Sequence, residues 1–203
     1  MKIKNIIFDL GNVLISFNPE EYLIKKDYSR HIRETIMNDI FLSQEWKSLD
    51  NGDITTPEAI DSIALKSSLT RDEINVVFNF RSDIMFPLDQ NARLLPGLKK
   101  QGFKLFYLSN FPLDTFEEIS NGYFFFRHFD GGVISSEAKL TKPDLRIYEL
   151  LLRQYSLRAS ESLFIDDLEV NVKAAISVGM NGLTTFGEPD ISAMLAEALR
   201  RII

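Results

Sequence analysis

Five short apolar runs alternate with stretches of helical composition along this chain, and this alternation narrows the possible folds sharply. The runs are continuous rather than alternating in polarity, as expected of strands buried on both faces. They cover residues 3–8, 103–108, 132–134, 162–165 and 182–185, and the helical stretches cover residues 91–101, 113–122, 145–155 and 169–178. Gly102 and Gly179 mark the ends of two of these helices. The pattern predicts an α/β fold, with helices on both faces of a parallel sheet.

One long segment breaks this rhythm. From about residue 19 to residue 86 no strand candidate of comparable strength occurs, and apolar residues recur at helical spacing. Asn18-Pro19 and Phe86-Pro87 stand at its borders, and proline restricts its predecessor in a way that suits a chain leaving one domain and re-entering it. We therefore predict a core domain of residues 1–17 and 88–203 and an inserted, all-helical domain of residues 18–87.

Composition limits the classes of partner. Of the 203 residues, 29 are acidic and 23 basic, and the net charge of −6 argues against nucleic acid or an anionic membrane as the main partner. The absence of cysteine excludes disulfides, thiolate metal sites and cysteine nucleophiles. The first apolar run is broken by Asp9 and is too short for a signal peptide or a membrane span. We expect a cytoplasmic protein, monomeric or weakly dimeric, with a small-molecule partner.

Polar clusters directly follow three of the predicted strands. Asp9 ends the first run, Ser109 and Asn110 follow the second, and Asp166 and Asp167 follow a later one. In an open parallel sheet, ligands bind beyond the carboxyl ends of the strands, near the point where the strand order reverses. Packing of the core does not require polar residues at these positions, so they predict a functional site.

The three aspartates predict a metal site. Asp9, Asp166 and Asp167 would concentrate three negative charges in one crevice if their strands are neighbours, which is costly without a cation. Oxygen ligands with no histidine or cysteine nearby select Mg²⁺, which keeps coordination sites for a substrate phosphate. A carboxylate can also attack phosphorus and form an aspartyl-phosphate.

A phosphoryl group needs hydrogen-bond donors and a fixed cation. Ser109, Asn110 and nearby backbone N–H groups can supply the donors. Lys142 is the candidate cation because it precedes Pro143, which we expect in the first turn of the next helix. Lys139 is a competitor that lacks such a proline.

The order of these motifs, with a helical insertion after the first, resembles that of the haloacid dehalogenase superfamily. The resemblance spans nearly the whole chain and implies a Rossmann-like core with a helical cap. It implies Asp9 as nucleophile and metal ligand, Asp167 and Asp166 as acidic metal contacts, and Ser109 and Asn110 as phosphate-binding residues. It also implies that Lys142 neutralises the nucleophile and the transferring group. Asn171 lies one helical turn after Asp167 and is expected to orient Lys142.

Gly11 departs from the pattern of the family. Phosphatases of the superfamily usually carry there a second aspartate, which protonates the leaving oxygen and later activates water. The backbone carbonyl of Gly11 can still bind the metal, but acid–base help worth roughly 10²–10⁴ in rate must come from elsewhere or be absent. Asn12 or a bound water is a weak substitute. The sequence Leu10-Gly11-Asn12-Val13 is similar to that of a branch of the superfamily that includes bacterial α-glucose-1-phosphate phosphatases. This similarity favours a sugar phosphate as substrate.

Within the predicted cap, residues 46–56 also resemble that branch and are expected to face the active site. Trp46, Leu49 and Asn51 are the candidates for substrate selection. The leading hypothesis is thus a Mg²⁺-dependent phosphatase of a small phosphorylated metabolite. Two alternatives stay open. Gly11 motivates the first, a catalytically weak or inactive module that binds a phosphorylated ligand or a protein. The second is a haloacid dehalogenase, which is disfavoured because that reaction needs no metal. A sugar-phosphate mutase is disfavoured as well, since Gly11 supplies no proton shuttle.

Overall fold

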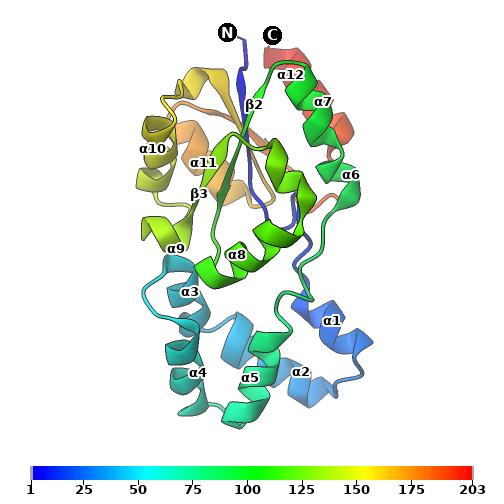
Figure 1. Ribbon diagram of the computed structural model, residues 1–203, viewed down its shortest axis with the longest axis vertical. Helices are drawn as coiled ribbons and strands as arrows, with labels where there is room; N and C mark the ends of the chain where they lie inside the picture. The colour runs from blue at the N-terminus through cyan, green and yellow to red at the C-terminus, as the bar shows by residue number, and fades with distance from the viewer. Residues whose placement is uncertain (1, 203) are drawn as a thin grey trace.

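A five-stranded, fully parallel sheet organises the computed structural model, which describes residues 2–202 (Figure 1). Its strands are β1 (Asn5–Phe8), β2 (Lys104–Ser109), β3 (Gly131–Ile134), β4 (Ser162–Asp166) and β5 (Asn181–Thr184), in the order β3-β2-β1-β4-β5. All pairs are parallel. Each strand coincides with one of the five predicted runs to within two residues, so the predicted α/β class is confirmed and the sheet is Rossmann-like.

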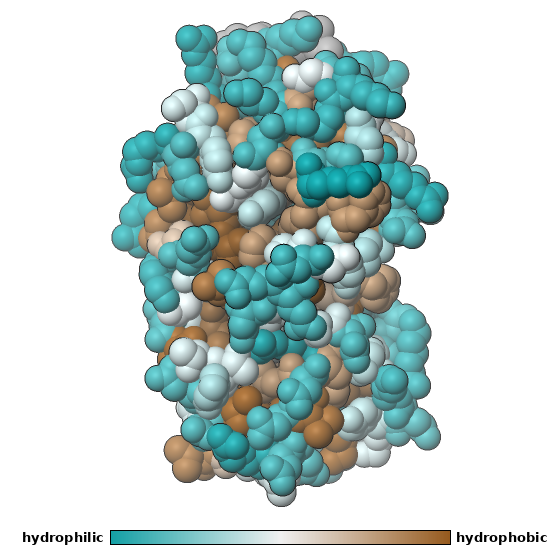
Figure 2. Space-filling view, viewed as in Figure 1, coloured by the Kyte–Doolittle hydropathy of each residue, from teal (hydrophilic) through white to brown (hydrophobic). Residues whose placement is uncertain are grey.

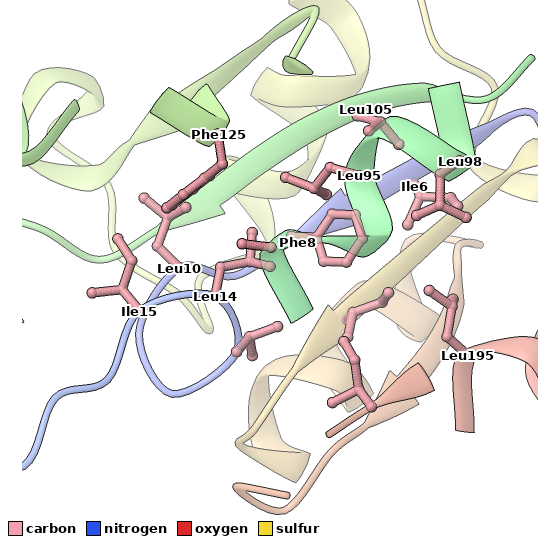
Figure 3. Packing of buried hydrophobic residues seen from close by; sticks show 14 of the residues in the cluster. Ile6, Phe8, Leu10, Leu14, Ile15, Leu95, Leu98, Leu105, Phe125 and Leu195 are labelled. Atoms are coloured by element: carbon pink, nitrogen blue, oxygen red, sulfur yellow. The ribbon is translucent and has the colours of Figure 1, made fainter. Parts of the chain in front are cut away.

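Helices cover both faces of this sheet. Side chains of β1 alternate between the faces, as the pleat of a strand requires. Ile6 and Phe8 pack into a cluster with Leu95 and Leu98 of α7 (Leu94–Lys100) and with α12 (Ser192–Ile202), as Figure 3 shows. Ile7 points the other way, into a cluster with α10 (Leu145–Gln154) and α11 (Glu169–Ser177). Burial on both faces explains the continuous apolar runs.

The remaining core helices have three to ten residues, and the structure corrects two details of the predicted helices. They are α6 (Asp89–Ala92), α8 (Leu113–Gly122), α9 (Ser135–Ala138) and the 3₁₀ turns Phe124–His128 and Ala159–Glu161. The helix predicted over residues 91–101 is divided between α6 and α7, because Pro96 cannot donate to the preceding turn. Pro143 lies before α10 rather than in its first turn: its peptide bond with Lys142 is cis, and Asp144 is the N-cap.

The segment between β1 and α6 contains helices joined by turns and loops, and its only β structure within the described residues is the isolated bridges of Ile15 with Gly11 and Pro87. It contains α1 (Pro19–Lys25), α2 (Arg30–Ile36), a π-helix (Met37–Phe41), α3 (Gln44–Asn51), α4 (Thr56–Ala64) and α5 (Arg71–Asn79). These helices lie beyond one end of the sheet in Figure 1 and pack around a hydrophobic cluster of their own, which includes Trp46. We call residues 18–87 the helical unit; that it forms an inserted domain stays a prediction.

Two adjacent connections join the helical unit to the core. The N–H of Ser16 donates to the carbonyl of Phe86 at 2.8 Å, and the N–H of Leu88 donates to the carbonyl of Leu14 at 2.8 Å. The chain therefore leaves and re-enters the core at one place.

On the face drawn in Figure 2, hydrophilic side chains cover most of the surface, and apolar ones occur in scattered groups. Within residues 2–202, no helix combines the length and the apolar character needed to cross a membrane. A cytoplasmic location and a monomeric or weakly dimeric state stay predictions.

Candidate active site

The candidate site lies where the strand order reverses. β1 is flanked by β2 and β4, and Phe8 is in register with Tyr107 on one side and with Ile165 on the other. The residues that follow these strands therefore meet at one edge of the sheet, where open parallel sheets bind ligands. The structure thus brings together the three polar clusters that the sequence places at strand ends.

Asp9 is buried at the centre of this edge, with 7% of its surface exposed. Its Oδ1 atom accepts hydrogen bonds from the backbone N–H of Leu10 at 2.7 Å and from Ser109 Oγ at 2.6 Å. Lys142 Nζ lies 2.9 Å from the same oxygen. Among the described residues, Oδ2 accepts no hydrogen bond. One oxygen of Asp9 is therefore held in place, while the other is left available.

Lys142 bridges two buried carboxylates. Its Nζ lies 2.6 Å from Asp166 Oδ2 and 2.9 Å from Asp9 Oδ1, and all three side chains are buried. Burial raises the pKa of Asp9 to about 7, and the charge of Asp166 acts in the same direction, whereas Lys142 and Ser109 oppose it. Burial alone would lower the pKa of Lys142, but the two carboxylates outweigh it and keep the pKa above its ordinary value. The ammonium group therefore stays charged.

The three aspartates can hold a cation. Asp9, Asp166 and Asp167 each offer a carboxylate oxygen, and these oxygens lie within 4.8 Å of one another. Asp167 is only partly buried, and among residues 2–202 its side chain accepts one hydrogen bond, a long one of 3.5 Å from Asn12 Nδ2. Burial and the charge of Asp166 raise the pKa of Asp167. A donor set made only of oxygens fits a hard cation such as Mg²⁺.

Asp166 is more constrained than its neighbour. Its oxygens receive hydrogen bonds from Asn171 Nδ2 at 3.1 Å, from the N–H of Leu168 at 2.8 Å and from Lys142. Asn171 thus donates to Asp166, and no hydrogen bond joins it to Lys142, in contrast to the direct orienting role predicted from the sequence. It orients the lysine only through the carboxylate between them.

Both ends of the Asn110 side chain are hydrogen-bonded to the backbone of Lys142. Its Nδ2 donates to the Lys142 carbonyl at 3.0 Å, and its Oδ1 accepts from the Lys142 N–H at 2.8 Å. This pair of bonds positions the lysine loop beside β2. The predicted phosphate contact of Asn110 stays a prediction.

Space is available at Gly11. A Cβ atom built there meets no other atom within 4 Å, and its backbone is not in the left-handed region. The next residue, Asn12, does adopt a positive φ of 52°, and its Oδ1 accepts from the N–H of Phe17 at 3.1 Å. The lack of a carboxylate at position 11 therefore has no steric cause.

A cavity of about 270 Å³ opens over Asp9. Its floor is polar, and much of its wall is apolar. The apolar and aromatic lining residues are Ile15, Phe17, Trp46, Met85, Phe111, Pro112 and Leu168. The polar ones are Asp9, Asn12, Asp50, Ser109, Asn110, Lys142, Asp167 and Asn171, with Gly11 beside them. The size suits a small ligand.

Helix α3 contributes Trp46 and Asp50 to this cavity. The two residues are four apart and share one helix face, and Trp46 stacks on Phe17 with ring centroids 6.0 Å apart. Leu49 and Asn51 lie on other faces of the helix and do not line the cavity. The structure thus places one of the three predicted selectivity residues at the site.

Asp50 lies within residues 46–56, the part of the cap expected from the sequence to face the active site, but it was not among the residues predicted to have a role there. It follows Trp46 by one helical turn, and that spacing was the available signal. Burial raises the pKa of Asp50 to about 7, and the charge of Asp9 adds to the effect. Ser135 Oγ donates to the backbone carbonyl of Asp50, and Lys139 Nζ donates to the backbone carbonyl of Gly52. Lys139 therefore binds the end of α3 and does not line the cavity, which leaves Lys142 as the lysine of the site.

Comparisons with known proteins identify relatives of this chain. A family model of haloacid dehalogenase-like hydrolases matches residues 3–179. The sesquiterpene phosphatase astK of Aspergillus oryzae is 32% identical over 180 residues, which cover 89% of this chain and 88% of that protein. Acyl-CoA dehydrogenase family member 10 of Mus musculus is 27% identical over 209 residues, but the match covers 96% of this chain and only 19% of that protein.

A solved structure shares the fold. The haloacid dehalogenase family enzyme bt-2542 of Bacteroides thetaiotaomicron, in complex with magnesium and inorganic phosphate, superposes with a TM-score of 0.75 at 24% identity. The superposition covers 95% of this chain and 98% of that one. At this identity, the likeness establishes the fold.

Proposed function

This chain belongs to the haloacid dehalogenase-like hydrolases, and from that membership we propose that it is a magnesium-dependent phosphatase of small phosphomonoesters. The observation that carries the proposal is the state of Asp9. One of its oxygens is fixed by Ser109, Lys142 and a backbone N–H, and the other accepts no hydrogen bond from the part of the chain that the structure describes, while Asp9 lines the cavity. A carboxylate held in this way is suited to nucleophilic attack.

The reaction would proceed in two steps. Asp9 Oδ2 attacks phosphorus, and the bond from phosphorus to the leaving oxygen breaks, which leaves an aspartyl-phosphate. Water then attacks the same phosphorus, and Asp9 is released with inorganic phosphate. Lys142 balances the charge of Asp9 and of the transferring group, while backbone N–H groups donate to the phosphoryl oxygens. Ser109 donates its one hydroxyl proton to Asp9 Oδ1, so it would have to turn away from Asp9 to make the phosphate contact predicted from the sequence.

Asp9, Asp167 and the carbonyl of Gly11 are the residues that we propose to hold Mg²⁺. When bound, the ion lowers the repulsion between the attacking carboxylate and the phosphate. Asp166 has less freedom to coordinate, because Lys142, Asn171 and the Leu168 N–H occupy its oxygens. We assign it chiefly to fixing Lys142, with the metal contact predicted from the sequence as a secondary role.

The lining of the cavity favours a substrate whose phosphate is esterified to an apolar group rather than to a sugar. Phe17, Trp46, Met85 and Phe111 offer few partners for sugar hydroxyl groups. A second cavity shares Phe17 and Leu168 with the first and extends to Phe186, which is 73% exposed. The relative astK, whose name describes it as a sesquiterpene phosphatase, supports the same choice. The sugar phosphate favoured by the sequence becomes the second candidate.

The helical unit of residues 18–87 is proposed to act as a cap. It supplies Trp46 and Asp50 to the cavity, and its own hydrophobic cluster allows it to move as a body. Closure over the core would exclude bulk water from the aspartyl-phosphate.

Phosphate release tests the proposal. The purified protein is assayed with 4-nitrophenyl phosphate, benzyl phosphate, a prenyl monophosphate and glucose 1-phosphate, with Mg²⁺ or with EDTA. We expect Mg²⁺-dependent release and a kcat/KM at least about tenfold higher for the apolar alkyl phosphates than for glucose 1-phosphate, roughly the discrimination that one or two buried methylene groups provide. Binding of phosphate or Mg²⁺ without any turnover would support a non-catalytic module instead. Halide release from a 2-haloacid in EDTA would support a dehalogenase.

A further inference from the structure

We propose that Asp50, on the helical unit, protonates the leaving oxygen and afterwards activates the hydrolytic water. This inference rests on the proposed phosphatase function and concerns the same site. An alkoxide is a poor leaving group, so cleavage of an alkyl phosphate needs a proton donor. Gly11 has no side chain with which to provide one.

The position of Asp50 meets the geometric requirement. It lines the cavity that Asp9 also lines, and it approaches from the helical unit, opposite the sheet edge that carries the nucleophile. Its carbonyl accepts a hydrogen bond from Ser135 of α9, and Ser135 Oγ in turn accepts from the N–H of Phe111 at 2.9 Å. Residues of the core therefore hold the backbone of Asp50 in place.

Its carboxyl group is also uncommitted. Within residues 2–202, no hydrogen bond or ion pair is made by its side chain, whereas Asp166 is bound by three groups. The charged groups that face it across the cavity are Asp9, Lys142 and Asp167. Burial and the charge of Asp9 raise its pKa to about 7, so both protonation states are accessible near neutral pH, as an acid–base catalyst requires.

The proton balance closes over one turnover. The carboxylic acid of Asp50 gives its proton to the leaving oxygen as the bond from phosphorus to that oxygen breaks, and the alcohol departs. The resulting carboxylate takes a proton from the water that attacks the phosphorus of the aspartyl-phosphate. Phosphate is released and Asp50 is protonated again, so one ester and one water give one alcohol and one phosphate.

Other side chains at the site cannot take this role. Asn12 and Ser109 do not titrate in the neutral range, Lys142 remains charged between two carboxylates, and Asp167 is assigned to the metal. Asp50 is the carboxyl group of the cavity that none of these assignments uses.

The experiment compares leaving groups. We measure kcat/KM for benzyl phosphate, whose alcohol needs protonation, and for 4-nitrophenyl phosphate, whose phenolate does not. Asp50→Asn is expected to lower kcat/KM for benzyl phosphate by about 10²–10⁴ and to change it less than about threefold for 4-nitrophenyl phosphate. It should also produce a burst of one nitrophenolate per enzyme, because the aspartyl-phosphate is then hydrolysed slowly.

Two further variants make the test specific. Gly11→Asp in the Asp50→Asn background places a carboxylate where a Cβ meets no neighbour, and it should restore at least a tenth of the wild-type benzyl phosphate activity. Asp53→Asn alters an exposed carboxylate three residues further on, outside the cavity, and should leave kcat/KM unchanged for both substrates.

The outcomes separate the inference from the function on which it rests. An equal loss on both substrates, or no loss on benzyl phosphate, would overturn the role of Asp50 while leaving the phosphatase assignment intact. A wild-type protein that hydrolyses neither substrate would overturn both.

Discussion

Buried carboxylates dominate the chemistry of single residues at this site. Burial raises the pKa of Asp9 and of Asp50 to about 7 and raises that of Asp167 as well. Each ionised group that loses hydration without a full set of partners weakens the folded state. Such an arrangement favours catalysis at the cost of stability, which is common at active sites.

Stability should therefore depend on Asp50 and on pH. The pKa of Asp50 in the folded protein lies above its ordinary value. The contribution of the protonated Asp50 to the free energy of unfolding is therefore fully present at low pH and is lost as the pH rises through about 7. In EDTA at pH 8, Asp50→Asn is expected to raise the free energy of unfolding by about 1–3 kcal/mol, with a smaller gain at pH 5. Urea unfolding at the two pH values measures this. Asp53→Asn is the control, and an equal gain at both pH values would contradict the assignment.

The sequence predicted those site residues whose position depends on a strand end. Asp9 directly follows β1, and Ser109 and Asp166 are the last residues of β2 and β4. Because the sheet is parallel and β1 lies between β2 and β4, these residues meet at one edge. Asp50 and the bonds of Asn110 to the Lys142 backbone could not be read in the same way. The direction in which they point depends on how α3 and the lysine loop dock against the core, which local patterns do not encode.

At the scale of elements, the end of α3 is the critical junction between the helical unit and the core. Gly52 ends this helix with φ +70°, and a Cβ there would overlap the carbonyl of Ser136 on α9. The Gly52 carbonyl accepts from Lys139, and the Asp50 carbonyl accepts from Ser135. This close approach fixes the end of α3 that brings Asp50 to the cavity it shares with Asp9, and only glycine combines that backbone conformation with that contact.

Gly52→Ala should therefore separate α3 from α9. The methyl group cannot be accommodated against a backbone atom, so the site should open, with kcat/KM lowered about tenfold or more and KM raised. Gly102→Ala is the matched control, because Gly102 also has a positive φ but a Cβ there meets nothing within 4 Å. Steady-state kinetics of both variants, alongside their thermal stability, measure the difference. Equal activities would show that the contact does not control the site.

For the whole molecule, a polar latch ties the helical unit to the core away from the site. Arg81, which is buried, donates to Asp114 Oδ2 of α8 at 2.7 Å and to Thr56 Oγ1 at 3.0 Å, and Thr56 donates to the same carboxylate at 2.6 Å. The predicted insertion of residues 18–87 implied a unit over the site, but the residues that hold it there are distant in sequence and follow no local pattern. Their pairing required the structure.

Removing the latch should favour an open form. Asp114→Ala leaves Arg81 without its charged partner and is expected to destabilise the closed arrangement by about 1–2 kcal/mol, because the carboxylate is half exposed. Faster proteolysis near residues 16–18 and 82–88 and a larger radius of gyration would report the opening. Asp89→Ala removes an exposed pairing with Arg93 and serves as the control. Unchanged proteolysis in Asp114→Ala would show that the latch does not hold the two parts together.

The proposed Mg²⁺-dependent phosphatase activity depends on Asp9 as its nucleophile. The most direct measurement is phosphate release from 4-nitrophenyl phosphate by the wild type and by Asp9→Asn, with Mg²⁺ and with EDTA. We predict release by the wild type only with Mg²⁺, and a loss of at least about 10³-fold in Asp9→Asn, since an amide cannot replace the attacking carboxylate. Wild-type turnover by Asp9→Asn would contradict the account.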